Sequence, residues 1–127
     1  MQEELIEGEL TESIIGAAIE VHRYWGPGLY EEIYEKSLCH ELTLQGFKYK
    51  RQVSLPLLYK GERVGDDLQL DVWVEGKVLV ENKHVKDLLP IHQAQLMTYL
   101  KLTQCRVGLL LNFHSKNLSQ TMKRIVL

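Results

Sequence analysis

The sequence predicts a single α/β sandwich whose elements follow in the order ααβββαβ. Three observations predict this class. The chain has 127 residues, about the length of one compact domain. Its apolar residues recur at helical spacing before Gly46, whereas the period changes towards that of strands after it. Its composition, 45% hydrophobic and 25% charged, is that of an ordinary globular protein.

Two helices are predicted before Gly46. Thr11 is the expected N-cap of the first, residues 12–24. The sequence Gly-Pro-Gly at 26–28 breaks the chain, and a second helix follows over residues 29–45. Gly46 is well placed to end that helix.

The following segments alternate as strands do. Residues 47–58 form an extended segment that Pro56 places at an edge or a break. Residues 60–62 form a turn, and residues 69–74 and 77–85 form a pair of strands joined around Glu75-Gly76.

The last third of the chain predicts one more helix and one or two strands. Pro90 suits the first turn of a helix over residues 91–103. Residues 106–113 are largely apolar and predict a buried strand. Residues 123–127 could add an exposed edge strand, through which two copies of the chain could pair as a homodimer.

The charge distribution and the search for targeting signals bear on the expected partner and localisation of the protein. The formal net charge is −2, yet five of the 17 acidic residues lie among the first twelve, so the chain from Ser13 onward carries an excess of base. Charge therefore neither favours nor excludes a nucleic-acid partner. We expect the acidic segment 1–9 to be flexible. With no signal peptide, no run near the ~20 apolar residues of a membrane span, and cysteines too few for a disulfide scaffold, we expect a cytoplasmic protein.

Three charged residues interrupt the predicted hairpin strands. Asp71 lies within the run LQLDVWV, and Glu81 and Lys83 lie within VLVENKHV. A charge in such a run is costly unless it is paired or holds a metal. The same acid-x-Lys spacing at Glu75 and Lys77 lacks apolar flanks and is explained as a solvated turn.

The register of the hairpin decides whether these three side chains can meet. Side chains alternate between the faces of a strand, so a shift of one residue moves a whole set to the other face. A two-residue loop at Glu75-Gly76 would put Asp71 and Glu81 on opposite faces. A three-residue loop puts both acids and Lys83 on one face, with Gly76 as the left-handed residue of a bulged turn. We therefore predict an odd-length loop.

Such a trio suits phosphodiester hydrolysis. Two neighbouring carboxylates repel unless a hard cation such as Mg²⁺ neutralises them. The cation lowers the pKa of a bound water, and a lysine on the same face can stabilise charge that develops at phosphorus. A strand-borne ion pair without a metal explains the three residues as well.

Several motifs together resemble one known family. The stretch Gly28-Leu-Tyr-Glu31-Glu-Ile-Tyr34 matches GxxExxY, the motif that names a family of small prokaryotic proteins within the PD-(D/E)xK nuclease superfamily. Asp71 and Glu81-Asn82-Lys83 resemble the D…ExK core of that superfamily. The stretch from Gln95 to Tyr99 resembles its QxxxY helix motif. The likeness covers about residues 10–127.

The resemblance implies a restriction-endonuclease-like fold, in which helices flank a mixed β-sheet within one domain over residues 1–127. It implies that Asp71 and Glu81 bind Mg²⁺ or Mn²⁺ with the backbone carbonyl of Asn82. Lys83 would be the catalytic lysine. Gln95 would support the nucleophile or phosphate, and Glu31 would be a further metal ligand or a base.

Other residues are weaker candidates, each with an alternative explanation. Tyr34 could pack over the site or belong to the core, and His92 and Tyr99 share a helix face with Gln95, although His92 could equally cap that helix. The acids Glu31, Glu32 and Glu35 by themselves indicate a solvated helix face. The weak candidates for substrate binding are Lys48, Lys50 and Arg51.

We therefore expect a metal-dependent nuclease that hydrolyses nucleic acid, with DNA as its partner and no membrane association. The alternative is a catalytically silent nucleic-acid- or protein-binding module that retains the nuclease fold. A metal-dependent hydrolase of another phosphate ester is a third possibility.

Overall fold

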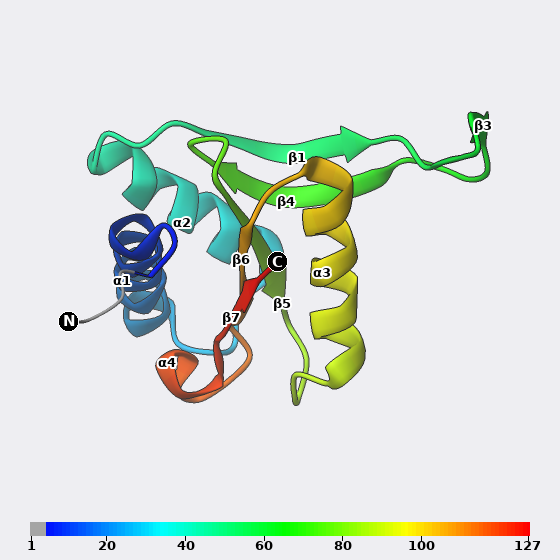
Figure 1. The fold of residues 1–127 in the computed structure, drawn as a ribbon. Coiled ribbons are helices and arrows are strands. Elements are labelled where there is room, and N and C mark those ends of the chain that lie inside the picture. The colour runs from blue at the N-terminus through cyan, green and yellow to red at the C-terminus, as the bar shows by residue number, and fades with distance from the viewer. Residues whose placement is uncertain (1–4) are drawn as a thin grey trace.

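A five-stranded sheet lies between two layers of helices in the computed structural model, which describes residues 5–127 (Figure 1). The strand order is β1-β4-β5-β6-β7, and only the β5–β6 pair is parallel. The predicted α/β class with a mixed sheet flanked by helices is confirmed. The strands of this sheet are β1 (Tyr49–Leu55), β4 (Leu68–Val74), β5 (Val78–Lys83), β6 (Val107–Asn112) and β7 (Lys123–Val126).

The helices cover the two faces of the sheet unequally. Helices α1 and α2, with the short α4, pack against a core that includes Val72, Val80 and Leu109. Helix α3 alone covers the other face, through Leu96 and Leu100. Gly108 of β6 allows this close approach, because a Cβ atom there would lie 2.8 Å from Leu96 Cδ2. The helices are α1 (Gly8–Trp25), α2 (Glu31–Leu44), α3 (Pro90–Thr103) and α4 (Leu118–Thr121).

The start of α1 differs from the prediction. The helix begins at Gly8 with Glu7 as its N-cap, whereas Thr11 lies inside it and donates a hydrogen bond of 3.0 Å to the carbonyl of Glu7. Thr11 as N-cap is therefore wrong. The acidic residue Glu9 suits the first turn, because negative charge stabilises the N-terminal end of a helix dipole. Helix α1 includes residues 8 and 9 of the segment expected to be flexible, and residues 1–4 lie outside the described chain.

A small hairpin that the sequence did not separate projects from the body of the molecule (Figure 1). It consists of β2 (Leu58–Tyr59) and β3 (Glu62–Arg63), joined at Lys60-Gly61 within the predicted turn. Its side chains Leu58, Tyr59 and Val64 are exposed. The hairpin continues β1 and β4 beyond the five-stranded sheet.

The β4–β5 hairpin has the predicted odd-length loop. Val74 pairs with Val78, so Glu75, Gly76 and Lys77 lie between the paired residues. Gly76 takes a left-handed backbone with φ of 65°, as expected, and Glu75 does so as well with φ of 54°. Continued for three residues, this register brings Asp71 opposite Glu81.

Strands β1 and β4 change faces near their middle. On β1, Tyr49 packs with the α1–α2 core, whereas Val53 and Leu55 pack with the α3 core, although all three have the same parity. On β4, Val72 belongs to the α1–α2 core and Leu70 to the α3 core. The change falls at Gln52 on β1, where the backbone φ is 49°, and at Asp71 on β4.

Both cysteines, Cys39 and Cys105, are buried and free. No helix within residues 5–127 is long and apolar enough to cross a membrane.

Candidate active site

Asp71 and Glu81 meet where β4 and β5 stop pairing through their backbones. The Asp71 backbone N–H donates to Glu81 Oε1 at 3.2 Å, and the Asn82 backbone N–H donates to Asp71 Oδ2 at 2.8 Å. Each carboxylate thus bonds to the strand that carries the other. We call Asp71 and Glu81 the acid pair.

The acid pair is buried enough to disfavour two negative charges. Glu81 is 5% exposed, and its burial, with the neighbouring Asp71 charge, raises its pKa from 4.5 to about 8. Burial also raises the pKa of Asp71, and the charges of Glu35 and Glu31 add to this rise. The pair therefore tends to retain a proton at neutral pH unless a cation neutralises it.

Helix α2 brings further acids to the same place. Glu31, the first residue of α2, is exposed and lines a hollow of about 460 Å³ together with Asp71. Helix α2 packs against β4 and β5. Glu31 is thus placed near Asp71, as its motif position implied. The remaining lining residues of this hollow are Glu32, Glu35, Arg51 and Gln52.

Glu35 is the acid that the sequence did not single out. It is only 4% exposed, so the explanation of all three α2 acids as a solvated face is wrong for Glu35. Arg51 donates to Glu35 Oε2 from Nε at 2.9 Å and from Nη2 at 2.6 Å. The Gln52 side-chain amide donates to both oxygens of Glu35 at 3.0 and 3.1 Å. We call Glu35, Arg51 and Gln52 the Glu35 cluster.

The sequence contains only a weak signal for this cluster. Glu35 lies one helical turn after Glu31, so the two share a face of α2. Arg51 and Gln52 stand sixteen and seventeen positions further along the chain, and nothing in the spacing connects them to that face.

Lys83 and Gln95 are not hydrogen-bonded to the acid pair. Lys83 ends β5 and is half-buried, and its positive charge partly counteracts the rise in the Glu81 pKa. It forms no ion pair with any residue of the described chain. Gln95 is exposed on α3.

Two other residues of α3 have different surroundings. Tyr99 packs partly buried against the α3 core, and its pKa is raised by burial and by the charges of Glu81 and Asp71. Its hydroxyl is therefore within the field of the acid pair. His92 accepts a hydrogen bond of 2.9 Å from the Leu89 backbone N–H through Nδ1. In the structure, His92 therefore caps the start of α3.

Tyr34 lies in the core rather than over the acid pair. Its ring is fully buried and stacks on Phe113 with centroids 4.8 Å apart. Its hydroxyl donates to the Gly26 carbonyl and accepts a bond of 2.9 Å from the Leu29 backbone N–H. Tyr34 thus holds the turn that leads into α2.

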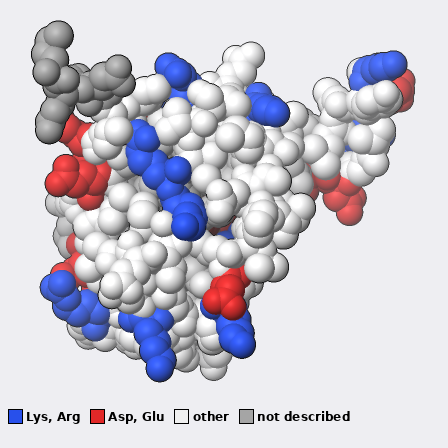
Figure 2. Space-filling view, turned by 60° about the horizontal axis from the view of Figure 1, so that its bottom comes forward, with Lys and Arg blue, Asp and Glu red and all other residues white. Residues whose placement is uncertain are grey.

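The three basic candidates for substrate binding do not line one hollow. Lys48 and Lys50 are exposed and line a separate hollow of about 310 Å³ with Trp73, whereas Arg51 lines the hollow beside Asp71. Lys and Arg side chains on the face shown in Figure 2 also lie in separate groups. Lys48 and Lys50 thus line a different hollow from Arg51.

Asn82 has a side chain that the neighbouring motif does not explain. It is 2% exposed, and neither its Nδ2 nor its Oδ1 has a hydrogen-bond partner among the described residues. Its backbone N–H is occupied by Asp71. Its side chain points away from Glu81, since neighbouring residues of a strand alternate.

The acid pair has the chemistry of a site for a hard cation, because carboxylate oxygens are the donors that Mg²⁺ prefers. Neither acid forms an ion pair with a cationic side chain of the described residues. Within residues 5–127, no group of three or more His, Cys, Asp or Glu side chains is arranged to hold a metal ion. The acid pair thus offers two carboxylates.

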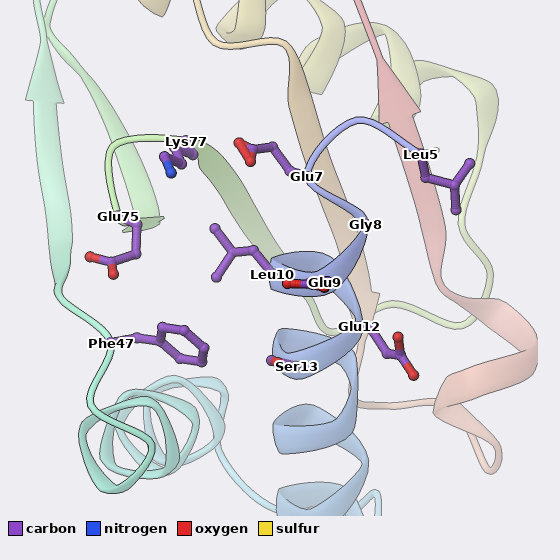
Figure 3. Close-up of a pocket in the computed structure, with 10 residues that line it drawn as sticks. All are labelled: Leu5, Glu7, Gly8, Glu9, Leu10, Glu12, Ser13, Phe47, Glu75 and Lys77. Atoms are coloured by element: carbon purple, nitrogen blue, oxygen red, sulfur yellow. The ribbon is translucent and has the colours of Figure 1, made fainter. Parts of the chain in front are cut away.

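A larger hollow lies elsewhere. It measures about 700 Å³ and surrounds the first turn of α1, beside the turn of the β4–β5 hairpin (Figure 3). Its acidic residues Glu7, Glu9 and Glu12 suit the positive end of that helix dipole. The acid pair lies at the opposite end of the hairpin from this hollow.

Comparison with known proteins gives one match. A family model described as the PD-(D/E)XK nuclease superfamily matches residues 8–125. No curated protein and no solved structure matches the chain. The matched segment runs from the first residue of α1 into β7, so it includes the acid pair, the Glu35 cluster and Lys83.

Proposed function

Because the chain belongs to the PD-(D/E)XK nuclease superfamily, we propose that it is a Mg²⁺- or Mn²⁺-dependent nuclease that hydrolyses phosphodiester bonds of nucleic acid, with DNA as its substrate. Nucleases of this superfamily generally use divalent metal ions. The observation that carries the proposal is the contact between half-buried Asp71 and buried Glu81, two carboxylates that form no ion pair with a cationic side chain of the described residues.

The acid pair would hold the metal, together with the backbone carbonyl of Asn82. Glu31, at the exposed start of α2, would be a further ligand or a base for the water. A bound divalent cation would polarise a phosphate oxygen and lower the pKa of a water molecule. The proton that the pair retains would leave when the metal binds, since metal ligands must be deprotonated.

The other residues would act on the phosphate and on the water. Lys83, on the strand of Glu81, would stabilise negative charge that develops at phosphorus. Gln95 would support the nucleophile from α3, with Tyr99 beside it. Arg51 would contact a phosphate oxygen through Nη1, because Glu35 occupies its Nε and Nη2.

Finer aspects of identity belong to the same proposal. We propose that residues 1–127 form one domain, that the chain is a prokaryotic member of the GxxExxY family through Gly28, Glu31 and Tyr34, and that it acts in the cytoplasm.

The test is cleavage of a panel of single strands, duplexes, branched DNA and RNA in Mn²⁺. Wild type and Lys83→Ala are purified in parallel. We expect cleavage by the wild type and a loss of about 100-fold or more in Lys83→Ala, the scale on which removal of one charge-stabilising group lowers turnover. Lys83→Ala should still bind Mn²⁺, since the acid pair remains. Equal cleavage by both proteins would contradict the role of Lys83.

One observation favours the second candidate function, a catalytically silent binding module. The acid pair has no third carboxylate converging on it within the described chain, so a metal would depend on two side chains, backbone and water. Binding to DNA that persists in EDTA, falls steeply with salt and is unaffected by Asp71→Asn would favour the module over the nuclease.

A further inference from the structure

Gln52 has an unusual backbone conformation for a residue in the middle of a strand. Its φ of 49° lies in the left-handed region, which a side chain disfavours and which persists only where the surroundings hold it. In the β1–β4 ladder, Arg51 pairs with Val72 and Val53 pairs with Leu70, whereas Gln52 has no assigned pair. The break therefore falls opposite Asp71.

This break is also where β1 and β4 change faces. Before it, Tyr49 packs with the α1–α2 core, and after it Val53 packs with the α3 core. Asp71 thus lies at the crossing between the two layers. This position explains why Glu35 and Glu31 of α2 influence its pKa, while its Oδ2 is bonded to Asn82 of β5.

The side chain of Gln52 joins Asp71 to a buried group. Its Nε2 donates to both oxygens of Glu35 at 3.0 and 3.1 Å and makes a longer bond of 3.4 Å to Asp71 Oδ1. Glu35 itself is fixed by burial and by two bonds from Arg51. Asp71 is therefore held from both sides, by Gln52 at Oδ1 and by the Asn82 backbone at Oδ2.

We propose that Gln52 is a positioning residue for Asp71. Its left-handed backbone turns the β1–β4 pair over at this point, and its side-chain amide transmits the position of buried Glu35 to the Asp71 carboxylate. Asp71 is thereby kept against β5, next to Glu81. The consequence for metal binding rests on the proposed function, whereas the effect on Asp71 does not.

Two glycine variants separate the amide from the backbone. Gln52→Gly keeps the left-handed backbone at lower cost, since glycine adopts positive φ readily, and removes only the side chain. Lys60→Gly is the matched control, because Lys60 has the same φ of 49° but lies in the projecting β2–β3 turn. If Gln52 acted only through its strained backbone, Gln52→Gly and Lys60→Gly should give the same results in the two measurements below.

The first readout is amide hydrogen exchange of Asn82 in the metal-free protein. Its N–H bonds to Asp71 Oδ2, so it should exchange about tenfold faster in Gln52→Gly, relative to the amide of Val80 in the same strand. Lys60→Gly should leave this ratio unchanged. An unchanged ratio in Gln52→Gly would overturn the proposal.

The second readout is the Kd for Mn²⁺ by calorimetric titration at pH 8. Residues that orient a metal ligand typically change metal affinity about 10- to 100-fold, and we expect a loss of this size in Gln52→Gly and none in Lys60→Gly. An unchanged Kd in Gln52→Gly would overturn the proposal. A wild type that binds no Mn²⁺ would count against the proposed function, and the exchange of Asn82 would then decide the role of Gln52 alone.

Discussion

Glu35 and Glu81 are two carboxylates buried to the same degree in opposite circumstances. Glu35 is 4% exposed and Glu81 5%. Glu35 accepts hydrogen bonds from Arg51 and Gln52 on both of its oxygens. Glu81 accepts one from the Asp71 backbone and faces another acid. Burial alone therefore does not identify a functional carboxylate, whereas burial without a cationic partner does point to one.

The difference has a physical cause. A buried charge is tolerated when a partner and hydrogen bonds replace the lost water, as Arg51 does for Glu35. Without such a partner the charged form is disfavoured, and the pKa rises as it does for Glu81. Among the described residues, Glu35 is thus held as a structural anion by Arg51, whereas Glu81 forms no ion pair.

The largest expected effect is the loss of stability when Glu35 loses the partner that neutralises it. Arg51→Ala leaves the buried Glu35 charge unpaired and should lower the free energy of unfolding by about 3 kcal/mol. The measurement is urea denaturation at pH 7. The double variant Arg51→Ala/Glu35→Gln should recover part of the loss, because a neutral amide can stay bonded to Gln52. A single variant as stable as wild type would contradict the role of Arg51.

The next effect concerns the pH dependence of the acid pair. Glu81 has a pKa of about 8 in the folded protein and an ordinary value of 4.5, so between these values the folded state binds more protons than the unfolded state. The free energy of unfolding should therefore fall as pH rises through this window, with a slope of up to about 1.4 kcal/mol per pH unit. Below pH 4.5 Glu81 is protonated in both states, so the free energy of unfolding no longer depends on its titration and its stabilising contribution is fully present.

Denaturation in EDTA at several pH values measures this slope, as the difference between wild type and Glu81→Gln. The amide removes the titration, so Glu81→Gln should become the more stable protein as pH 8 is approached. Glu75→Gln, on the exposed turn of the same hairpin, is the control. A difference that does not change with pH would contradict the raised pKa of Glu81.

The smallest expected effect is the stabilisation of the folded protein by Mn²⁺ at the proposed site. Mn²⁺ at ten times its Kd should stabilise the wild type by about 1.4 kcal/mol through mass action. Asp71→Asn should lose this stabilisation, since it removes one of two charged ligands. Thermal unfolding at pH 8 with and without Mn²⁺ measures both. A stabilisation that survives in Asp71→Asn would place the metal elsewhere.

The hairpin shows how far local sequence reaches. The charges of Asp71 and Glu81 in apolar runs, together with Gly76, predicted the three-residue loop that the register contains. Alternation alone predicted one common face for the trio, and it could not anticipate that β4 changes faces at Asp71. A change of faces depends on the backbone of the neighbouring strand at Gln52, which lies nineteen residues away in the chain.

Two further candidates for the site, a tyrosine and a histidine, show the same limit of prediction from local sequence. Tyr34 and His92 stand at positions that a motif or a helix face could bring to the site. The structure instead uses Tyr34 to hold the turn before α2 and His92 to cap α3. A buried polar atom forms its hydrogen bond with a nearby backbone donor or acceptor that has no other partner. Which group that is depends on how the elements pack.

The sequence by itself determined the order of the longer elements and the odd hairpin loop, because these depend on periodicity and short-range spacing. The resemblance of its motifs indicated the superfamily. Only the tertiary structure decided which buried acid is neutralised. Arg51 and Gln52 reach Glu35 because β1 packs beside α2 and turns over at Gln52. Burial and pairing depend on residues distant in the chain, and local patterns do not contain them.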